Sequence, residues 1–232
     1  MPVFRLTEDI RFPPVSLADE SGLLAIGGDL SAERLLCAYG EGIFPWFSKG
    51  DPLLWWFTSP RLVIFPGEFH IPKRVARYQR KTDLTITRDE TFVEVMQQCA
   101  LTRTETGEET WIIDEMFEAY QNLYALGYAH SVECWEEGKL VGGLYGVALG
   151  KVFFGESMFS RVSCASQFAL IALVDYLAKK NFKMIDCQMT TNHLLRFGAR
   201  EINGSKFHTL LKQYTGDISP QEHWYSNEKT TK

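Results

Sequence analysis

A segment in the second half of the chain has the pattern of a helix that is apolar almost all the way round. It runs from Ser163 to Lys180, and its apolar side chains include Phe168, Leu170, Ile171, Leu173, Val174 and Leu177. A helix of this kind has no side suited to water, so it has to be covered by another layer, here expected to be a β-sheet. The fold is therefore expected to be built around this segment.

The segments around this helix have the pattern of β-strands. Three consecutive strands joined by tight turns, and a fourth strand after the helix, are predicted at 131–136, 140–149, 151–159 and 183–188. A short helix, a strand and a last helix are predicted at 192–197, near 200–202 and at 206–214. An antiparallel meander followed by helix, strand, helix and strand resembles the GNAT-type acyltransferase fold. This likeness of topology does not by itself assign a function.

The amino-terminal part of the chain has a different composition. Residues 21–72 are rich in Gly, Pro and Trp, with one short helix predicted at 31–39 and ended by Gly40. We therefore expect an α+β protein with two parts. A small irregular N-terminal α/β module covers residues 1–72, and a GNAT-like C-terminal catalytic domain covers residues 73–232.

Between this module and the meander, the apolar spacing predicts one strand and two helices. The strand is at 84–87, and the helices are at 89–100 and 114–126, the second capped by Asp114. At the other end of the chain, residues 226–232 are polar, and they are expected to be disordered.

The formal net charge of the chain is -5, which argues against indiscriminate binding of nucleic acid. One basic cluster nevertheless exists within nine residues: Lys73, Arg74, Arg77, Arg80 and Lys81. If this segment is helical, residues 73, 77, 80 and 81 share one face. Taken alone, such a run is more often a solvated helix face than a binding surface.

Cysteine usage and the amino end indicate a cytoplasmic protein. The five cysteines are an odd number without a Cys-x-x-Cys pair, which is typical of reduced packing residues. The amino end lacks the layout of a signal peptide, and no apolar stretch reaches about 18 residues. The five histidines show no metal-ligand spacing, so no metal site is predicted.

Polar residues stand inside two of the apolar strands. Glu156 follows Phe154 and precedes Met158, and alternation would put all three on one face of the strand. Asp186 and Gln188 likewise share one face of the strand predicted at 183–188, unless that face is simply a polar edge. A buried carboxylate loses hydration worth several kcal/mol, so these positions are candidates for a reaction or a ligand.

The chemistry available to these side chains is that of an amine attacking an activated carbonyl. The Gln188 amide does not titrate near neutrality, but its carbonyl oxygen can accept an N–H from an amine. Asp186 can polarise that amide or hold a cationic amine. The turn at 160–167 contains no glycine for close approach to a pyrophosphate, which disfavours coenzyme A as the acyl donor.

Two tryptophans lie on predicted loops. Trp46 follows a proline, and Trp111 comes just before the helix that starts at Asp114. An indole in such a place is more often a core anchor, although near a basic patch it can stack on a nucleobase.

Six short motifs in the chain are found together, in this order and at compatible spacing, in one family of enzymes. They are Gly27-Gly28-Asp29-Leu30, Gly42-Ile43-Phe44-Pro45-Trp46-Phe47, Thr110-Trp111-Ile112, Gly142-Gly143-Leu144-Tyr145-Gly146, Phe154-Gly155-Glu156-Ser157-Met158-Phe159-Ser160 and Asp186-Cys187-Gln188. With these motifs the chain resembles the bacterial leucyl/phenylalanyl-tRNA-protein transferases from about Gly22 to Tyr214.

The resemblance implies transfer of Leu or Phe, less well Met, from aminoacyl-tRNA to the N-terminal Arg or Lys of an acceptor protein. This addition creates an N-end rule degradation signal, and no cofactor is implied. Trp46 and Trp111 would hold the 3′ adenosine, and the basic cluster would bind the acceptor stem of the tRNA. The positions that match the apolar side-chain pocket are Leu144, Phe153, Met158, Leu170, Leu173 and Ile185.

The same resemblance implies roles for the polar strand residues. Gln188 would accept the proton of the acceptor amine with help from Asp186, and Glu156 would place the amines. Because the tRNA ester is already activated, orientation can replace much of the base catalysis.

Some positions depart from the family pattern, and two other functions remain open. Residues 55–61 replace a more usual Trp-Trp-Ser-Pro-x-Pro-Arg, and the loop at 102–109 is longer than typical. Leu144 and Leu173 stand where relatives have Met and Phe, so the preference between Leu and Phe does not carry over. The alternatives are a coenzyme A-dependent N-acyltransferase of the same fold and a non-catalytic RNA-binding adaptor.

Overall fold

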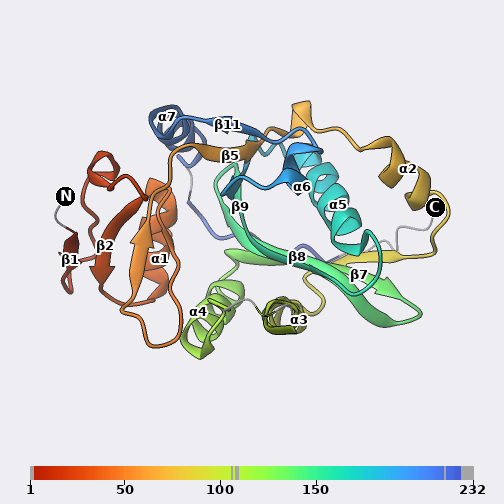
Figure 1. Cartoon of the computed structure of the whole chain (residues 1–232), viewed down its shortest axis with the longest axis horizontal. Coiled ribbons are helices and arrows are strands. Elements are labelled where there is room, and N and C mark those ends of the chain that lie inside the picture. Colours follow the sequence, from red (N-terminus) through yellow and green to blue (C-terminus); the bar gives the residue numbers. More distant parts are fainter. Residues whose placement is uncertain (1–2, 106, 108–109, 217, 226–232) are drawn as a thin grey trace.

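The computed structural model describes residues 3–105, 107, 110–216 and 218–225, so the tail at 226–232 lies outside the described residues. The predicted loop at 102–109 is described only in part, and its residues 102–105 are helical, so the preceding helix runs further than predicted. Within the described residues the fold is α+β, as predicted, and it contains two sheets (Figure 1). No helix of this part of the chain is both long and apolar enough to cross a membrane.

The smaller sheet is formed by the amino-terminal part of the chain. Its strand order is β1-β2-β4-β3, with bounds β1 (Phe4–Leu6), β2 (Leu23–Gly27), β4 (Leu54–Trp56) and β3 (Phe44–Pro45). The helix α1 (Ala32–Glu41) begins after Ser31, whose hydroxyl accepts the N–H of Arg34. It ends at Gly42 and not at Gly40, because Gly42 has the left-handed backbone (φ 76°) that stops a helix.

The larger sheet has seven strands in the order β11-β5-β10-β9-β8-β7-β6. The bounds are β5 (Arg61–Ile64), β6 (Thr85–Arg88), β7 (Ala129–Glu136), β8 (Lys139–Leu149), β9 (Val152–Ser160), β10 (Met184–Gln188) and β11 (Arg200–Ile202). The predicted antiparallel meander is confirmed as β7, β8 and β9, and β10 pairs with β9 in parallel. The strand β5 lies between β10 and β11, although it precedes residue 72 in the chain.

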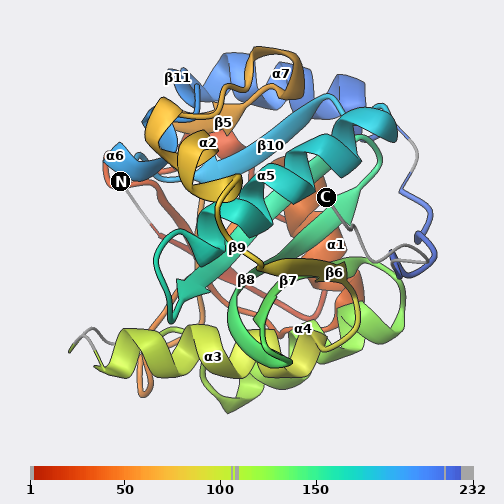
Figure 2. The same ribbon diagram turned by 90° about the vertical axis from the view of Figure 1, so that its right-hand side faces the viewer.

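Helices cover both faces of the larger sheet (Figure 1 and Figure 2). The helix α5 (Ala165–Lys179) packs on one face, and its apolar residues are buried, as predicted. The helices α3 (Phe92–Glu105) and α4 (Asp114–Ala125) pack on the opposite face. The remaining helices are α2 (Lys73–Gln79), α6 (Asn192–Leu195) and α7 (Gly204–Tyr214), with two short 3-10 turns at Val15–Leu17 and Pro66–Glu68.

Two helix starts differ from the prediction. The helix α3 begins at Phe92, because Asp89 has a left-handed backbone (φ 56°) that a helix cannot contain, and its carboxylate bonds elsewhere. In α4, Asp114 is the first helical residue and not the cap; Ile113 is the cap and offers no side-chain bond. The acidic Asp114 still favours this helix end, where the helix dipole is positive.

The core consists of two hydrophobic clusters. One includes the residues between the sheet, α3, α4 and the small module, among them Tyr39, Tyr120 and Phe154. The other includes the residues between the sheet, α5 and α2, among them Phe153 and Leu173. The strand β9 therefore contributes to both clusters, and it forms part of the candidate site described next.

Candidate active site between β9 and β10

The regular pairing of β9 with β10 stops after three residue pairs, the last being Asp186 with Phe154. Just beyond that point both strands are irregular. The register of β9 against β8 shifts between Gly155 and Ser157, and that of β10 against β5 shifts between Asp186 and Gln188. Gln188 also has a left-handed backbone (φ 59°). A cavity of about 400 Å³ lies there, lined by residues of both strands.

The shift in β9 overturns one prediction from alternation. Phe154, Glu156 and Met158 do not share a face, because Glu156 is an extra residue in a β-bulge between the paired residues Gly155 and Ser157. Phe154 belongs to the cluster with α3 and α4, whereas Met158 packs with the cluster under α5. The bulge thus removes Glu156 from the regular alternation of the strand. The glycine at position 155 was the sequence feature that could have indicated this bulge.

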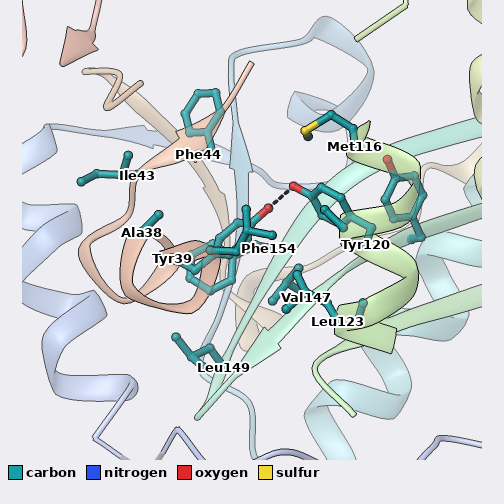
Figure 3. Packing of buried hydrophobic residues seen from close by; sticks show 14 of the residues in the cluster. Ala38, Tyr39, Ile43, Phe44, Met116, Tyr120, Leu123, Val147, Leu149 and Phe154 are labelled. Atoms are coloured by element: carbon teal, nitrogen blue, oxygen red, sulfur yellow. Dashed lines mark hydrogen bonds between the residues drawn. The ribbon is translucent and has the colours of Figure 1, made fainter. Parts of the chain in front are cut away.

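Glu156 is held by three side chains. Its Oε1 accepts hydrogen bonds from the Tyr39 hydroxyl at 2.8 Å and from the Gln188 Nε2 at 3.0 Å, and its Oε2 accepts one from the Tyr120 hydroxyl at 3.2 Å. The two tyrosine hydroxyl oxygens also lie within hydrogen-bond distance of each other (Figure 3). No local pattern in the sequence pointed to either tyrosine, because both come from distant helices, α1 and α4.

Burial determines the protonation behaviour of this group. Loss of hydration raises the pKa of Glu156 to about 7, although the hydroxyls of Tyr39 and Tyr120 act in the opposite direction. Burial, and then the nearby Glu156, raise the pKa of each tyrosine hydroxyl well above its usual value. Both tyrosines therefore stay neutral hydrogen-bond donors, and Glu156 changes its charge near neutral pH.

Gln188 is oriented by its contact with Glu156. An amide has a donor nitrogen and an acceptor oxygen on opposite sides, and here Nε2 faces the carboxylate of Glu156. The carbonyl oxygen is therefore directed away from Glu156. Such an oxygen can accept an N–H from an amine that enters the cavity.

Asp186 is fully buried and paired with Arg61, which is also fully buried. The carboxylate oxygens accept Nε and Nη2 of Arg61 at 2.8 and 2.7 Å, and Oδ1 also accepts the backbone N–H of Gln188 at 2.9 Å. Arg61 in turn donates to the carbonyl of Gly42 at 2.9 Å. Asp186 thus fixes the backbone of Gln188, and its partner Arg61 links the larger sheet to the end of α1. Arg61 is a site residue that the sequence reasoning missed.

The six residues predicted to form an apolar pocket all line this one cavity: Leu144, Phe153, Met158, Leu170, Leu173 and Ile185. Five of them, all but Met158, are less than 5% exposed, so this part of the wall is apolar and buried. Glu156 and Gln188 line the same space. The structure therefore brings the polar pair and the six apolar side chains together; we call this space the apolar cavity.

Trp46 and Trp111 lie outside the lining of the apolar cavity. Trp46 is 41% exposed, and its ring lies 5.7 Å from that of Trp56. Trp111 is buried, and its ring lies 6.3 Å from that of Tyr120, the residue that donates to Glu156. A second cavity of about 840 Å³ is lined by Phe47 and Ile112, the sequence neighbours of the two tryptophans.

The basic cluster occupies α2 and the turn after it. Its five side chains, Lys73, Arg74, Arg77, Arg80 and Lys81, belong to exposed residues, whereas Val75 of the same helix is buried. Tyr78 stacks on Phe168 of α5 with ring centroids 5.9 Å apart. This helix is thus fixed to the layer that covers the apolar cavity and presents its cations to solvent.

The amino end of α5 offers little to a pyrophosphate. The N–H of Ala165 bonds to the carbonyl of Val162, and the N–H of Ser166 bonds to the hydroxyl of Ser160 at 2.9 Å. Cys164 takes the left-handed conformation (φ 65°) at this turn without a glycine. Since two of the N–H groups already have partners, this turn does not favour coenzyme A.

Nothing in the described part of the chain gathers three or more His, Cys, Asp or Glu side chains in a way that would hold a metal ion. The polar groups at and around the apolar cavity are carboxylates, an amide, guanidinium groups, hydroxyls and the imidazole of His193.

Comparisons of the sequence with family models and with curated proteins agree on one family. The family described as leucyl/phenylalanyl-tRNA protein transferase matches residues 63–212, and its N-terminal domain matches residues 28–59. The chain is 58% identical to the leucyl/phenylalanyl-tRNA--protein transferase of Desulfotalea psychrophila over 97% of this chain and 99% of that protein. It is 54% identical to the protein of the same name from Syntrophobacter fumaroxidans, over 97% and 96%. Among solved structures, FemX covers 78% of this chain and 71% of its own, with 11% identity and a TM-score of 0.47.

Proposed function

The chain belongs to the leucyl/phenylalanyl-tRNA protein transferase family, an aminoacyltransferase family, and from this premise we propose its substrates and the roles of its site residues. The donor is Leu-tRNA or Phe-tRNA, with Met-tRNA used less well. The acceptor is a protein whose N-terminal residue is Arg or Lys. The product carries one added residue at its amino terminus and is thereby marked for N-end rule degradation.

One observation supports this proposal above the others: an oriented amide and a carboxylate lie on the wall of a cavity that is lined mainly by apolar residues. Its volume of about 400 Å³ is within the range of small-ligand pockets. Leu, Phe and Met side chains are apolar, so they gain free energy by leaving water for this wall. The polar pair then lies where the ester of such a residue would meet an amine.

The proposed reaction is a direct aminolysis of the tRNA ester. The acceptor nitrogen attacks the ester carbonyl carbon, the new C–N bond forms, and the bond from that carbon to the ribose oxygen breaks. One proton leaves the amine, and the departing ribose oxygen takes up a proton. The ester supplies the driving force, so the protein has to orient the two substrates and accept the N–H of the amine.

Each polar residue has a separate task in this scheme. The Gln188 carbonyl oxygen accepts the N–H of the attacking amine, because its Nε2 is already held by Glu156. Asp186 acts as a positioning residue through the backbone N–H of Gln188 and through Arg61. Tyr39 and Tyr120 hold the carboxylate of Glu156 in place.

The tRNA is proposed to bind at two further places. Trp46 and Trp111 hold the 3′ adenosine, and support for this comes from the contact of Trp111 with Tyr120 at the polar end of the apolar cavity. The exposed cations of α2 contact the phosphates of the acceptor stem. Because the chain as a whole is acidic, these contacts are limited to a few phosphates of the tRNA.

A transfer assay with defined substrates tests the proposed function. Purified protein is mixed with tRNA charged with labelled Leu and with a peptide that begins with Arg. We expect label in the peptide, no label when the peptide begins with Glu or has an acetylated amino terminus, and no label when the donor is first treated with ribonuclease. Label that survives ribonuclease, or binding of acetyl-coenzyme A with transfer of its acetyl group, would overturn the proposal.

A further inference from the structure

A short segment near the carboxyl end of the chain packs against the end of β6 and the start of β7 and buries one tryptophan. Trp224 is only 4% exposed, although its neighbour Tyr225 is 56% exposed. Its indole ring stacks on His130 with a centroid distance of 3.8 Å and an interplanar angle of 2°. Tyr176 and Phe182 also contact this ring, at 4.9 and 6.2 Å.

The position of this segment is specified by polar contacts as well as by packing. The backbone N–H of Trp224 donates to Asp89 Oδ2 at 2.6 Å, and its carbonyl accepts from Arg88 at 3.3 Å. Asp89 is fully buried, and it also accepts from His130 Nδ1 and the N–H of Ser131 at 2.7 and 2.8 Å. A buried carboxylate that accepts hydrogen bonds from three donors, one of them the backbone of Trp224, fixes the position of this segment.

A second close approach fixes the segment three residues earlier. The N–H of Gln221 bonds to the carbonyl of Gly127 at 2.8 Å. A Cβ atom added at Gly127 would lie 2.4 Å from the carbonyl oxygen of Gln221, so only glycine allows the segment to lie there. The segment that carries Trp224 is therefore fitted to the sheet and not loosely attached.

The packing of Trp224 reaches the apolar cavity through one residue. The ring of Phe153 contacts the Trp224 ring, with centroids 5.8 Å apart, and Phe153 also lines the apolar cavity. The tip of the Phe153 ring lies against Gly146, where an added Cβ would be only 2.6 Å from the ring. The Phe153 ring thus contacts Gly146 and Trp224, and it also lines the apolar cavity.

We infer that Trp224 is a positioning residue for donor selection: it keeps the Phe153 ring in the wall of the apolar cavity and thereby sets the space left for the donor side chain. This inference rests on the proposed function, because it takes the apolar cavity as the place where the donor side chain binds. Without the indole, the ring of Phe153 gains room to retreat, and the cavity becomes larger. A larger cavity favours Phe over Leu, because closely similar apolar side chains are discriminated only by fit.

The test measures kcat/KM for Leu-tRNA and for Phe-tRNA, with one Arg-started peptide as acceptor. We expect Trp224→Ala to raise the Phe:Leu ratio of kcat/KM by roughly 3- to 10-fold, with the KM for the acceptor peptide unchanged. Trp224→Phe, which keeps a ring behind Phe153, should stay near the wild-type ratio. Tyr225→Ala removes the exposed ring next to it and serves as the matched control with an unchanged ratio.

Two further variants distinguish a failure of this inference from a failure of the proposed function. Phe153→Leu alters the cavity wall directly, so an unchanged Phe:Leu ratio in this variant would refute the proposed role of the cavity. If Phe153→Leu shifts the ratio but Trp224→Ala lowers kcat/KM for Leu-tRNA and for Phe-tRNA by the same factor, the inference about Trp224 is wrong. If Trp224→Ala adds no further shift in the Phe153→Leu background, Trp224 acts through Phe153, as inferred.

Discussion

The amide nitrogen of Gln188 donates to the carboxylate of Glu156 at 3.0 Å, although the two residues come from different strands, β10 and β9. Each residue stands at an irregularity of its strand: Glu156 is the extra residue of a bulge, and Gln188 has a left-handed backbone. Without these irregularities the two strands would continue their regular pairing. The hydrogen bond between the two side chains therefore depends on the same distortion that opens the apolar cavity.

Replacement of Gln188 by Met tests whether the amide orients the acceptor amine. Met has a similar length and volume but no carbonyl oxygen to accept the N–H. We expect kcat to fall by about 10- to 100-fold with little change in the donor KM, since misplacement of a reacting group costs up to about 10²-fold. Steady-state transfer kinetics measure both values. Equal losses in kcat and in donor binding would contradict the separation of roles.

Glu156 is expected to give the transfer reaction a pH dependence near neutrality. Its pKa in the folded chain is about 7, and the ionised carboxylate is the stronger acceptor for the hydrogen bond from Gln188. kcat/KM should therefore rise as the pH increases through 7. In Glu156→Gln the rise attributed to this group should be absent. The acceptor amine also titrates, at about 7.7–8.0, but it does so equally in both proteins, so the ratio of the two pH profiles isolates Glu156.

The same group makes the free energy of unfolding depend on pH. The pKa of Glu156 is raised from 4.5 to about 7, so between these values the folded chain binds a proton that the unfolded chain has lost. Its stabilising contribution is thus complete below pH 4.5 and is lost as the pH rises through 7, with a slope of at most about 1.4 kcal/mol per pH unit. Denaturant titrations of the wild type and Glu156→Gln at several pH values should show this difference; parallel curves would refute the raised pKa.

The regular elements could be predicted from the sequence because their signals are local. The meander, α5 and β10 follow from apolar periodicity, and their bounds in the structure differ from the predicted ones by only a few residues. The face of Met158 could not be derived by alternation, because one extra residue in the strand reverses every side chain beyond it.

The partners of the site residues could not be predicted in the same way. Tyr39 lies 117 positions before Glu156, and Arg61 lies 125 positions before Asp186. Contacts at such separations are decided by the packing of whole layers, and neither side chain has a local pattern that indicates its partner. The sequence feature that came closest to indicating a partner was Arg61 at the start of the apolar strand β5, because a buried cation needs a buried anion.

Trp46 provides a test of the proposed adenosine site that does not disturb the core. The side chain is 41% exposed, so Trp46→Ala should leave the thermal unfolding midpoint almost unchanged. Removal of one stacking partner costs about 1–3 kcal/mol, and we expect the donor KM to rise accordingly while kcat changes less. Trp46→Tyr keeps an aromatic face and should recover part of the loss. A donor KM that stays at the wild-type value in Trp46→Ala would exclude stacking at this residue.

The cations of α2 and of the turn after it are expected to control the salt dependence of donor binding. Removal of one phosphate-binding cation should reduce the slope of log affinity against log salt by about 0.9, so Arg77→Ala and Arg80→Ala should each flatten the slope and weaken binding at low salt. Both residues are exposed, and Lys206→Ala on α7 removes an equally exposed charge as the matched control.

Fluorescence anisotropy with charged tRNA at several salt concentrations measures the slope, and transfer at saturating donor measures kcat, which should be retained. An unchanged salt slope in both variants would refute the assignment of tRNA binding to these cations. We expect kcat to depend on Glu156 and not on these cations, because Glu156 lies at the proposed reaction centre and the cations only hold the tRNA.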